Sequence, residues 1–195
     1  MRSWSIISIA RFSKPIQNGR AHAADGTRPF SVSGGDCLQI VPFPQKDSAA
    51  ALSMAGECAR LFFHTVHTVN AADYSPEQLD AWAPRIPDAG DWQRRFSGHP
   101  VFLAQEEGQI VGFGDIYPDG LLDLLYVHAG CQGGGIGRAL VQALERAVTP
   151  PRCYTVYASI TARPFFERMG YRVVQPNFVK RGGVILRNDR MEKPV

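Results

Sequence analysis

The sequence predicts one α/β domain built on a mixed, mostly antiparallel twisted sheet with helices on both faces. Of its 195 residues, 45% are hydrophobic and 20% are charged, which is the composition of a globular domain and not of a disordered or fibrous chain. Residues 101–127 contain three apolar runs separated by short turns, a pattern typical of neighbouring antiparallel strands. Residues 136–148 carry the clearest helical period, and another apolar run follows at 154–159, so a helix connects two strands there.

From residue 36 onward, the expected elements follow the order β–α–α–β–β–β–α–β–α–β–β. Two helices precede the second strand, and a short helix at 162–169 ends at Gly170, the residue type that favours a left-handed C-terminal cap. We expect strands at residues 37–43, 101–105, 110–114, 121–127, 154–159, 171–174 and 184–191.

The starts of the first two helices are marked by capping residues. Asp47 or Ser48 caps the first, because a short oxygen-bearing side chain can accept a hydrogen bond from an N–H of the first turn. Ser75 caps the second, Pro76 takes its first position, and Gln78 closes a capping box. These signals fix where both helices begin.

The N-terminal segment differs from the rest of the chain. Its first 24 residues contain four basic residues and no acidic one. We expect residues 1–35 to be a disordered extension and residues 36–192 to form the domain, because such composition cannot bury a core. A transit peptide, or a weak signal-peptide core at residues 4–10, is the alternative for this segment.

Charge and cysteine content exclude several classes of function. Lys and Arg total 21 against 18 Asp and Glu, and the net charge of +3 is too small to indicate nucleic-acid binding. No apolar stretch reaches the roughly 20 residues that a membrane-spanning helix needs. Cys37, Cys58, Cys131 and Cys153 form no CxxC pair and have no histidine at zinc-ligand spacing. We therefore expect no metal, and reduced thiols in a cytoplasmic protein.

A glycine-rich loop joins the strand at 121–127 to the helix at 136–148. The first N–H groups of a helix have no partner within it, and glycine lets a ligand approach them, so this loop predicts a phosphate site. A P-loop would need Gly-Lys-Ser/Thr, but this helix begins with Gly137-Arg138. A dinucleotide fingerprint would need a third glycine where Leu140 stands.

The loop sequence Gln132-Gly-Gly-Gly-Ile-Gly137 resembles the acetyl-CoA pyrophosphate motif of the Gcn5-related N-acetyltransferase (GNAT) family, Q/R-x-x-G-x-G/A. A second stretch, Ser159-Ile-Thr-Ala-Arg-Pro-Phe-Phe-Glu-Arg-Met-Gly-Tyr171, resembles the family's N-x-x-A-x-x-F-Y-x-x-x-G-F/Y. Residues 74–78, Trp82 and the Ser-Ile-Thr-Ala run at 159–162 are similar to the YafP-like branch of the family. The resemblance covers about residues 36–192.

The resemblance implies the GNAT acyl-CoA N-acyltransferase fold and a definite reaction. Acetyl-CoA is expected in a V-shaped opening between the strands at 121–127 and 154–159, with its pyrophosphate on the amides of 132–138. A backbone N–H near 125–127 polarises the thioester, and an amine attacks it directly, without a metal. The cofactor-binding residues implied by the resemblance are Leu125, Tyr126, Val127, Gln132, Gly133, Gly134, Gly135, Ile136, Gly137, Arg138, Ser159, Ala162, Phe165 and Phe166.

Asp123 is the candidate catalytic base. A primary amine is largely protonated at neutral pH and must lose a proton before it attacks. Strict alternation places Asp123 on the face of Leu125 and Val127, where the family usually carries a catalytic acidic residue. A carboxylate in so apolar a strand is costly unless it is hydrogen-bonded or functional, so a structural Asp that binds a neighbouring loop or helix end is the alternative.

The proton donor for the departing thiolate is left open by the sequence. The position of the family's Tyr holds Phe166, which cannot donate a proton, and the position of its Asn holds Ser159. Ser159 as a catalytic residue, Tyr157 and an ordered water are the alternatives. Unassisted departure is a fourth, because a thiol pKa of about 8.5 makes the thiolate a tolerable leaving group.

Several side chains are candidates with a structural alternative. His67, Tyr74 and Trp82 are weak candidates for acceptor binding, with a helix-surface histidine and packed aromatic contacts as the alternatives. Arg138 contacts a phosphate of CoA or belongs to a solvated helix face. Cys131, beside the loop, is an inert thiol or a reactive one.

The sequence thus predicts a cytoplasmic transferase, an acetyl-CoA-dependent N-acetyltransferase acting on a primary amine of a small molecule or protein. The alternative, favoured by Phe166, is a catalytically weak acyl-CoA-binding regulatory or interaction module. We expect neither nucleic acid nor a membrane as partner. The acceptor and the oligomeric state, a homodimer included, stay open.

Overall fold

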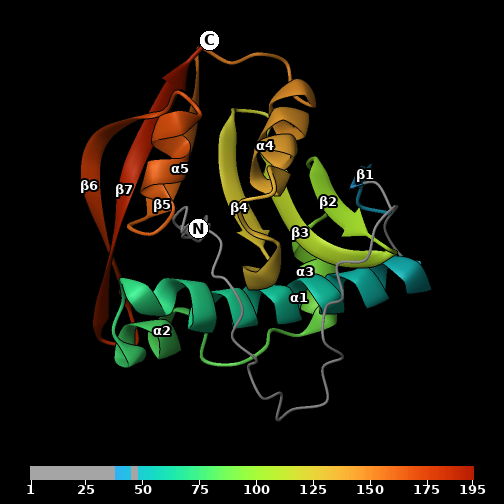
Figure 1. Cartoon of the computed structure of the whole chain (residues 1–195), viewed down its shortest axis with the longest axis horizontal. Coiled ribbons are helices and arrows are strands. Elements are labelled where there is room, and N and C mark those ends of the chain that lie inside the picture. Colours follow the sequence, from blue (N-terminus) through green and yellow to red (C-terminus); the bar gives the residue numbers. More distant parts are fainter. Residues whose placement is uncertain (1–37, 45–47) are drawn as a thin grey trace.

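The computed structural model describes residues 38–44 and 48–195 (Figure 1). The expectations for residues 1–35, for Cys37 and for Asp47 as a cap lie outside the described residues.

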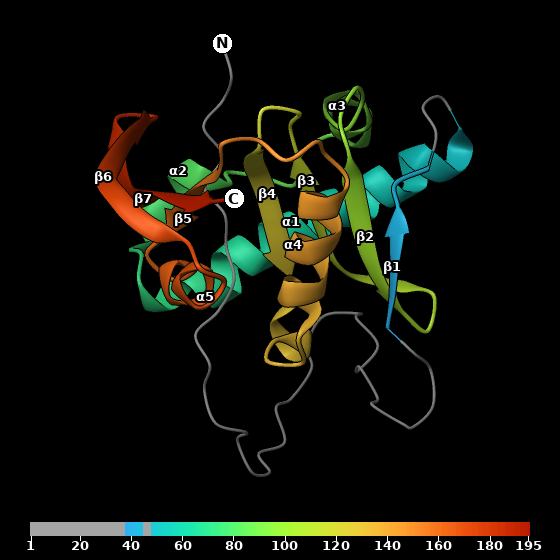
Figure 2. The same cartoon turned by 90° about the horizontal axis from the view of Figure 1, so that it is seen from above.

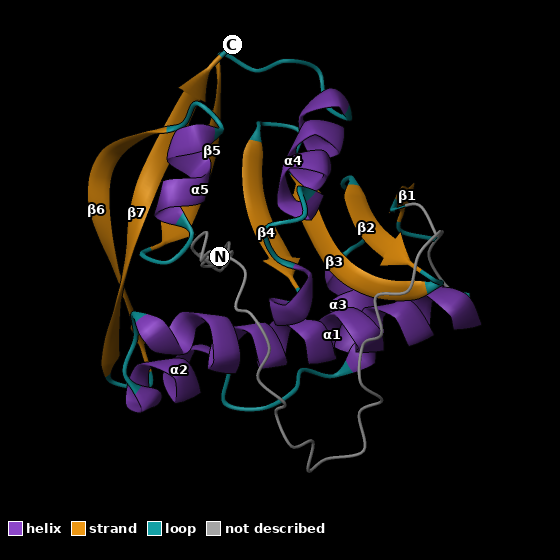
Figure 3. Ribbon diagram, viewed as in Figure 1, coloured by secondary structure: helices purple, strands orange, loops and turns teal. Residues whose placement is uncertain are grey.

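Within the described residues, seven strands form one sheet in the order β1-β2-β3-β4-β5-β7-β6 (Figures 1 and 3). Only β4 and β5 pair in parallel there, and the other neighbours pair antiparallel, which confirms the predicted mixed, mostly antiparallel sheet. The strands are β1 Gln39–Pro42, β2 Val101–Glu106, β3 Gln109–Ile116, β4 Leu121–Val127, β5 Cys153–Ser159, β6 Arg172–Arg181 and β7 Val184–Pro194.

Helices cover both faces of the sheet, as predicted, with α4 and α5 on one face and α1, α2 and α3 on the other (Figure 2). The α-helices are α1 Ala49–Val69, α2 Pro76–Trp82, α3 Ala89–Arg95, α4 Ile136–Arg146 and α5 Arg163–Arg168. Two 3-10 turns, η1 Asn70–Ala72 and η2 Ala129–Cys131, follow α1 and β4.

Each face of the sheet has its own apolar core. On one face, Leu140 and Leu144 of α4 pack with β-strand residues and with Phe166 of α5. On the other face, Phe62 of α1 and Trp92 of α3 pack against the sheet. The central strands β3 and β4 supply residues to both cores, so the backbone of β4 is held from both sides.

The predicted helix starts are confirmed where the structure describes them. The Oγ of Ser48 accepts the N–H of Ala51 at 3.0 Å. Ser75 and Gln78 form a complete capping box, with bonds of 3.0 and 3.3 Å between each side chain and the other's backbone N–H.

Helix α3 is absent from the elements that we expect from the sequence. Asp88 caps it, because its Oδ1 accepts the N–H groups of Gly90 and Asp91 at 2.9 and 3.1 Å. Two prolines, Pro84 and Pro87, precede it and a glycine lies within it, so the segment is expected to be a loop. Packing of Trp92 into the core outweighs that local preference.

The last two strands extend beyond the predicted 171–174 and 184–191. β6 runs to Arg181, and Gly182 and Gly183, both with positive φ, turn the chain into β7. β6 is an edge strand of the sheet, and an edge strand tolerates a proline, here Pro176, in its middle. Its many polar residues make it difficult to recognise as a strand from the sequence.

Two further observations concern the described residues alone. No helix among them is both long and apolar enough to cross a bilayer. Cys58, Cys131 and Cys153 all carry free thiols, as we expect from the sequence.

Candidate active site

The glycine loop opens α4 with exposed backbone. Gly135 is the N-cap of α4 in the left-handed region, with a φ of +88°, and no side chain of the described residues caps the helix. Gly133 has a φ of +84°, and a Cβ added at either glycine would meet no described atom within 4 Å. The positive φ values require glycine, and the open space leaves the first-turn N–H groups of α4 accessible to an anion.

Two side chains hold this loop against β4. The Nε2 of Gln132 donates to the carbonyl oxygen of Val127 at 3.0 Å, so this motif residue ties the loop to the end of the strand. The Nδ1 of His128 accepts the N–H of Gly130 at 3.2 Å. Burial, and then the charge of His64, lower the pKa of His128, which favours the neutral ring that can accept this bond.

The N–H groups of β4 alternate between its two neighbouring strands. The N–H of Leu124 donates to the Oδ1 of Asp115 on β3 at 2.6 Å, and that of His128 donates to the carbonyl of Val111 on β3 at 2.8 Å. Because N–H directions alternate along a strand, the N–H groups of Leu125 and Val127 face β5 instead.

β5 does not pair with β4 at that level. The two strands pair only at Leu121 with Thr155 and Leu122 with Val156, although β4 continues to Val127 and β5 to Ser159. The strands therefore part after their first residues, as we expect for a V-shaped opening. The N–H of Leu125 faces the part of β5 from which β4 has separated.

A bulge at Asp123 breaks the alternation of β4. Asp115 is opposite Leu124 and Ile116 is opposite Leu122, so Asp123 is an extra residue in the register. The prediction that Asp123 shares a face with Leu125 is therefore wrong, because the bulge shifts the alternation by one. Its carboxylate instead reaches α3.

The partner of Asp123 on α3 is Arg95. Its Nη2 lies 2.5 Å from the Oδ2 of Asp123, whose side chain is 9% exposed. Burial alone would lower the pKa of Arg95, but the carboxylates of Asp123 and Asp115 outweigh burial and raise it. The ion pair thus favours the charged guanidinium of Arg95.

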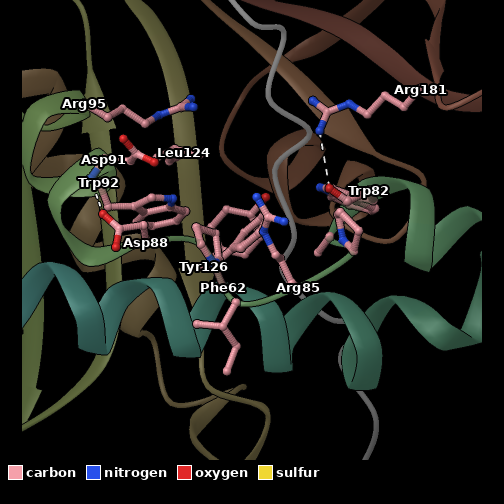
Figure 4. Close-up of a pocket in the computed structure, with 14 residues that line it drawn as sticks. Phe62, Trp82, Arg85, Asp88, Asp91, Trp92, Arg95, Leu124, Tyr126 and Arg181 are labelled. Carbon is pink, nitrogen blue, oxygen red and sulfur yellow. Dashed lines mark hydrogen bonds between the residues drawn. The ribbon is translucent and has the colours of Figure 1, made fainter.

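A cavity of about 490 Å³ lies on the α1 and α3 side of β4 (Figure 4). Its size is within the range of small-molecule sites. Residues from α1, the loop after α2, α3, β4 and the end of β6 line it: Phe62, Trp82, Ala83, Pro84, Arg85, Ile86, Pro87, Asp88, Asp91, Trp92, Arg95, Leu124, Tyr126 and Arg181.

The three candidates for acceptor binding differ in position. Trp82 lines the cavity, and its indole N–H hydrogen-bonds to Tyr126, a fully buried phenol whose pKa is raised by burial. The hydroxyl of Tyr74 instead donates to the carbonyl of Arg187 at 2.6 Å and accepts the N–H of Ile160 at 3.0 Å. Neither Tyr74 nor His67 lines the cavity.

His67 binds within its own neighbourhood. Its Nε2 lies 3.4 Å from the Oδ1 of Asp80 on α2, and its Nδ1 lies 3.0 Å from the carbonyl of Phe63. These contacts agree with the structural alternatives, in which His67 is a helix-surface histidine and Tyr74 makes a packed aromatic contact.

The second motif is largely buried. Ser159, Ala162 and Phe166 are 0% exposed, Phe166 packs edge-on against Tyr171, and Phe165 is partly buried. The Oγ of Ser159 accepts the N–H of Ala162 at 2.9 Å. The hydroxyl of Ser159 is thus a turn-forming group, and this position does not support the catalytic role predicted for it.

The side chains of Leu125, Tyr126 and Val127 are also buried, so a ligand in the opening can use only their backbone. Ile136 and Gly137 are buried at the start of α4, whereas Gly133, Gly134, Gly135 and Arg138 are exposed.

Burial raises the pKa of Cys131 to about 11, and Glu106 adds to the effect. The inert alternative therefore describes this thiol. Among residues 38–44 and 48–195, no group of three or more His, Cys, Asp or Glu side chains is arranged to hold a metal ion.

Comparison with known proteins identifies the family. The acetyltransferase (GNAT) domain profile matches residues 70–192. The chain belongs to the GNAT family. The GNAT domain and the N-acetyltransferase relatives support an acetyl-CoA-dependent N-acetyltransferase, as predicted.

Individual GNAT proteins support the same assignment. The chain is 33% identical over 131 residues to the uncharacterized N-acetyltransferase YafP of Escherichia coli K12, covering 67% of this chain and 83% of YafP. A GCN5-related N-acetyltransferase structure from Rhodopseudomonas palustris is 30% identical, with a TM-score of 0.71 over 85% of this chain and 99% of the other. The fold is also shared with yncA of Salmonella typhimurium, a putative acetyltransferase solved with acetyl-CoA, at 16% identity and a TM-score of 0.59 over 83% and 94% of the chains.

The sequence did not predict the arginines of the cavity. Arg95 lies on the unpredicted α3, Arg85 lies in the loop before it, and Arg181 ends a strand longer than expected. Only the Asp88 cap could have indicated α3, and nothing in the spacing indicates that these three side chains line the same cavity.

Proposed function

We propose that the protein transfers the acetyl group of acetyl-CoA to a primary amine of a small molecule or protein by direct attack. The observation that carries the proposal is the separation of β4 from β5 after Leu122, beside the uncapped start of α4. Leu125 lies on β4, and the loop after β4 leads directly to the start of α4. A backbone N–H for the thioester and a helix end for the phosphates would therefore lie close together.

The residues of the glycine loop fit the pyrophosphate of acetyl-CoA. Gly133 and Gly135 leave open space where a side chain would stand, and the first turn of α4 directs its N–H groups outward. Arg138 is exposed in this first turn and would add a positive charge. Acetyl-CoA binding by yncA, a protein of the same fold, is consistent with this role.

The chain would act on the acetyl group mainly by positioning. Bound acetyl-CoA supplies a thioester whose carbonyl carbon accepts the amine. The N–H of Leu125 would donate to the carbonyl oxygen as negative charge develops there. Asp123 would receive the proton of the amine directly or through water, so that the lone pair of nitrogen is available. The N–C bond forms as the C–S bond breaks, and CoA leaves as the thiolate.

The thiolate needs one proton to become CoA. Phe166 carries no proton and the Ser159 hydroxyl is buried in a turn, so neither is our candidate donor. Tyr157 is the first residue of β5 after the positions paired with β4. Burial raises the pKa of Tyr157 despite the opposing effect of Arg190, which favours the protonated phenol that a donor requires.

A catalytically weak acyl-CoA-binding module is the second candidate function. The buried Phe166 at the family's Tyr position favours it, because that position cannot supply a proton. Calorimetric titration of acetyl-CoA and a thiol-release assay separate the two candidates. Enzyme function predicts binding together with CoA release for at least one member of a broad panel of amino acids, polyamines, aminoglycosides and peptides. Tight binding without release across the panel contradicts the enzyme and supports the module.

A further inference from the structure

A buried histidine–aspartate pair lies next to the bulge of β4, and the proposed reaction does not use it. The Nε2 of His99 lies 3.0 Å from the Oδ2 of Asp115 on β3, and the two side chains are 3% and 0% exposed. A carboxylate accepts hydrogen bonds and does not donate them, so the Nε2 of His99 carries the proton of this bond. Burial of such a pair is costly, and removing one partner leaves the other uncompensated.

The other oxygen of Asp115 binds the backbone of β4. The Oδ1 of Asp115 accepts the N–H of Leu124 at 2.6 Å, in a bond that is buried. Leu124 is opposite Asp115 in the register and directly follows the bulged Asp123. Four residues further on, the N–H of His128 donates instead to a backbone carbonyl, that of Val111. At the bulge, a side chain therefore holds the peptide that joins Asp123 to Leu124.

The end of β3 fixes the ring of His99. This ring stacks on Tyr117, with ring centroids 4.2 Å apart and ring planes 20° from parallel. The carbonyl of the next residue, Pro100, accepts the N–H of Ile116 at 3.1 Å. The register of β3 shifts between Asp115 and Ile116, so both contacts lie where the bulge occurs. They keep the Nε2 of His99 directed at Asp115.

Arg95 and His99 lie four residues apart on the segment that leads from α3 to β2. Arg95 binds the side chain of Asp123, and His99 reaches the N–H of Leu124 through Asp115. Burial has the largest effect on the pKa of Arg95 and lowers it, but the charges of Asp123 and Asp115 outweigh burial. Arg95, His99 and Asp115 thus form a clamp, which holds one residue of the bulge by its side chain and the next by its backbone.

The bulge determines the directions of two groups in the proposed reaction. Asp123, the proposed base, and Leu125, whose N–H would bind the thioester oxygen, are the two neighbours of Leu124. Because the N–H of Leu124 is bonded to β3, the N–H of Leu125 faces β5. A shift of one residue in the register would reverse both directions. The bond from Leu124 to Asp115 therefore favours the register that keeps both groups in place.

We propose that Asp115 and His99 are positioning residues for acetyl transfer, which hold the bulge of β4 so that Asp123 and the N–H of Leu125 keep their positions. This inference rests on the proposed function. Both residues act through the backbone of β4 and not on the reacting atoms. A displacement of about 1 Å in a reacting group can lower a rate by about 100-fold, so loss of the clamp lowers kcat.

Matched variants of the full chain test the proposal with an amine that releases CoA. His99→Phe keeps a ring against Tyr117 but loses the donor, whereas His99→Gln keeps an N–H donor. We expect kcat to fall about 10-fold in His99→Phe and 10- to 100-fold in Asp115→Ala, and to recover in His99→Gln. The calorimetric Kd of acetyl-CoA should change little, because the glycine loop is held by bonds of its own. Tyr171→Phe, which removes a buried bond to Glu145, is the control and should leave kcat unchanged.

A double-variant cycle separates positioning from a general loss of stability. If Asp115 acts through Asp123, then Asp115→Ala lowers kcat far less in the Asp123→Asn protein than in wild type. A general loss of stability would instead multiply the two effects. Urea unfolding of each variant measures its folded fraction. If Asp115→Ala does not fold, His99→Phe takes its place in the same cycle.

Amide hydrogen exchange measures the clamp without turnover. We expect the N–H of Leu124 to exchange at least about 10-fold faster in His99→Phe than in wild type, and the N–H of His128 to exchange alike in both. If wild type turns over but kcat is unchanged in His99→Phe and Asp115→Ala, or the effects multiply, the positioning proposal is wrong while acetyl transfer stands. If wild type releases no CoA with any amine, the proposed function is wrong. Faster exchange at Leu124 then supports the clamp on β4, and unchanged exchange overturns it.

Discussion

The Oδ2 of Asp123 on β4 and the Nη2 of Arg95 on α3 lie 2.5 Å apart. This ion pair joins the bulge in the central strand to a wall of the cavity. It gives the buried carboxylate the partner that its apolar surroundings require, and it accounts for an Asp within an otherwise apolar strand. Asp123 thus has the structural role that the sequence left open as an alternative. Its proposed catalytic role needs a test of its own.

Asp123→Asn tests that catalytic role. We expect kcat/KM to fall by about 100-fold near neutral pH, because the general base is lost, and to recover partly at high pH, where the amine loses its proton unaided. A pH–rate profile of both proteins measures this. Glu77→Gln, which removes one exposed charge from α2, is the control. Equal profiles for wild type and Asp123→Asn would remove Asp123 from the chemistry.

Arg95→Leu tests the ion pair as a structural element. Its loss leaves the carboxylate of Asp123 buried without this partner, so we expect a loss of about 3 kcal/mol in the free energy of unfolding by urea. The double variant Arg95→Leu/Asp123→Leu removes both charges and should recover much of that loss. If the double variant is as unstable as the sum of the single ones, the pair does not act as a unit.

Tyr74→Phe tests the link between three distant segments. Its hydroxyl joins the carbonyl of Arg187 to the N–H of Ile160, so its removal leaves two backbone groups without this partner. We expect a loss of about 2 kcal/mol in unfolding free energy, with KM for the acceptor unchanged. Tyr154→Phe is the comparison and should cost about 1 kcal/mol, since among the described residues its hydroxyl donates only to the carbonyl of Glu145. A large change in acceptor KM with stability intact would instead indicate that Tyr74 binds substrate.

Cys131 is expected to react slowly with iodoacetamide at pH 7.5. Burial and Glu106 raise the pKa of its thiol from 9.0 to about 11, so the thiolate is about 100-fold scarcer in the folded protein than in the unfolded chain. Mass spectrometry of peptides labelled with and without urea measures the ratio. Labelling of Cys131 at equal rates in both conditions contradicts the assigned environment.

The elements with strong local signals were predictable. The capping box at Ser75, the amphipathic helix that begins at Ile136 and the glycine loop between strand and helix all follow from short-range pattern. The helix ends at Arg146, two residues before the predicted end, and helix boundaries commonly differ by one or two residues. The opening between β4 and β5 was predicted from the family resemblance, and the short pairing of these two strands agrees with that prediction.

The features that spacing could not predict depend on distant contacts. The bulge at Asp123 lies where the pairing register between β3 and β4 shifts. The pattern of residues along β4 alone cannot predict such a shift. α3 forms because Trp92 packs into the core despite two preceding prolines. Arg181 reaches the cavity only because β6 is far longer than its apolar residues suggest.

The glycine cradle is tested most directly by calorimetric titration of acetyl-CoA into three proteins. Gly135 and Gly98 share a φ of +88°, and an added Cβ at either meets nothing within 4 Å, so Gly135→Glu and Gly98→Glu carry the same backbone strain. Only Gly135→Glu puts a carboxylate at the start of α4, where phosphate is expected. We predict that wild type and Gly98→Glu bind acetyl-CoA alike and that Gly135→Glu binds none. Unchanged affinity in Gly135→Glu would contradict the central claim.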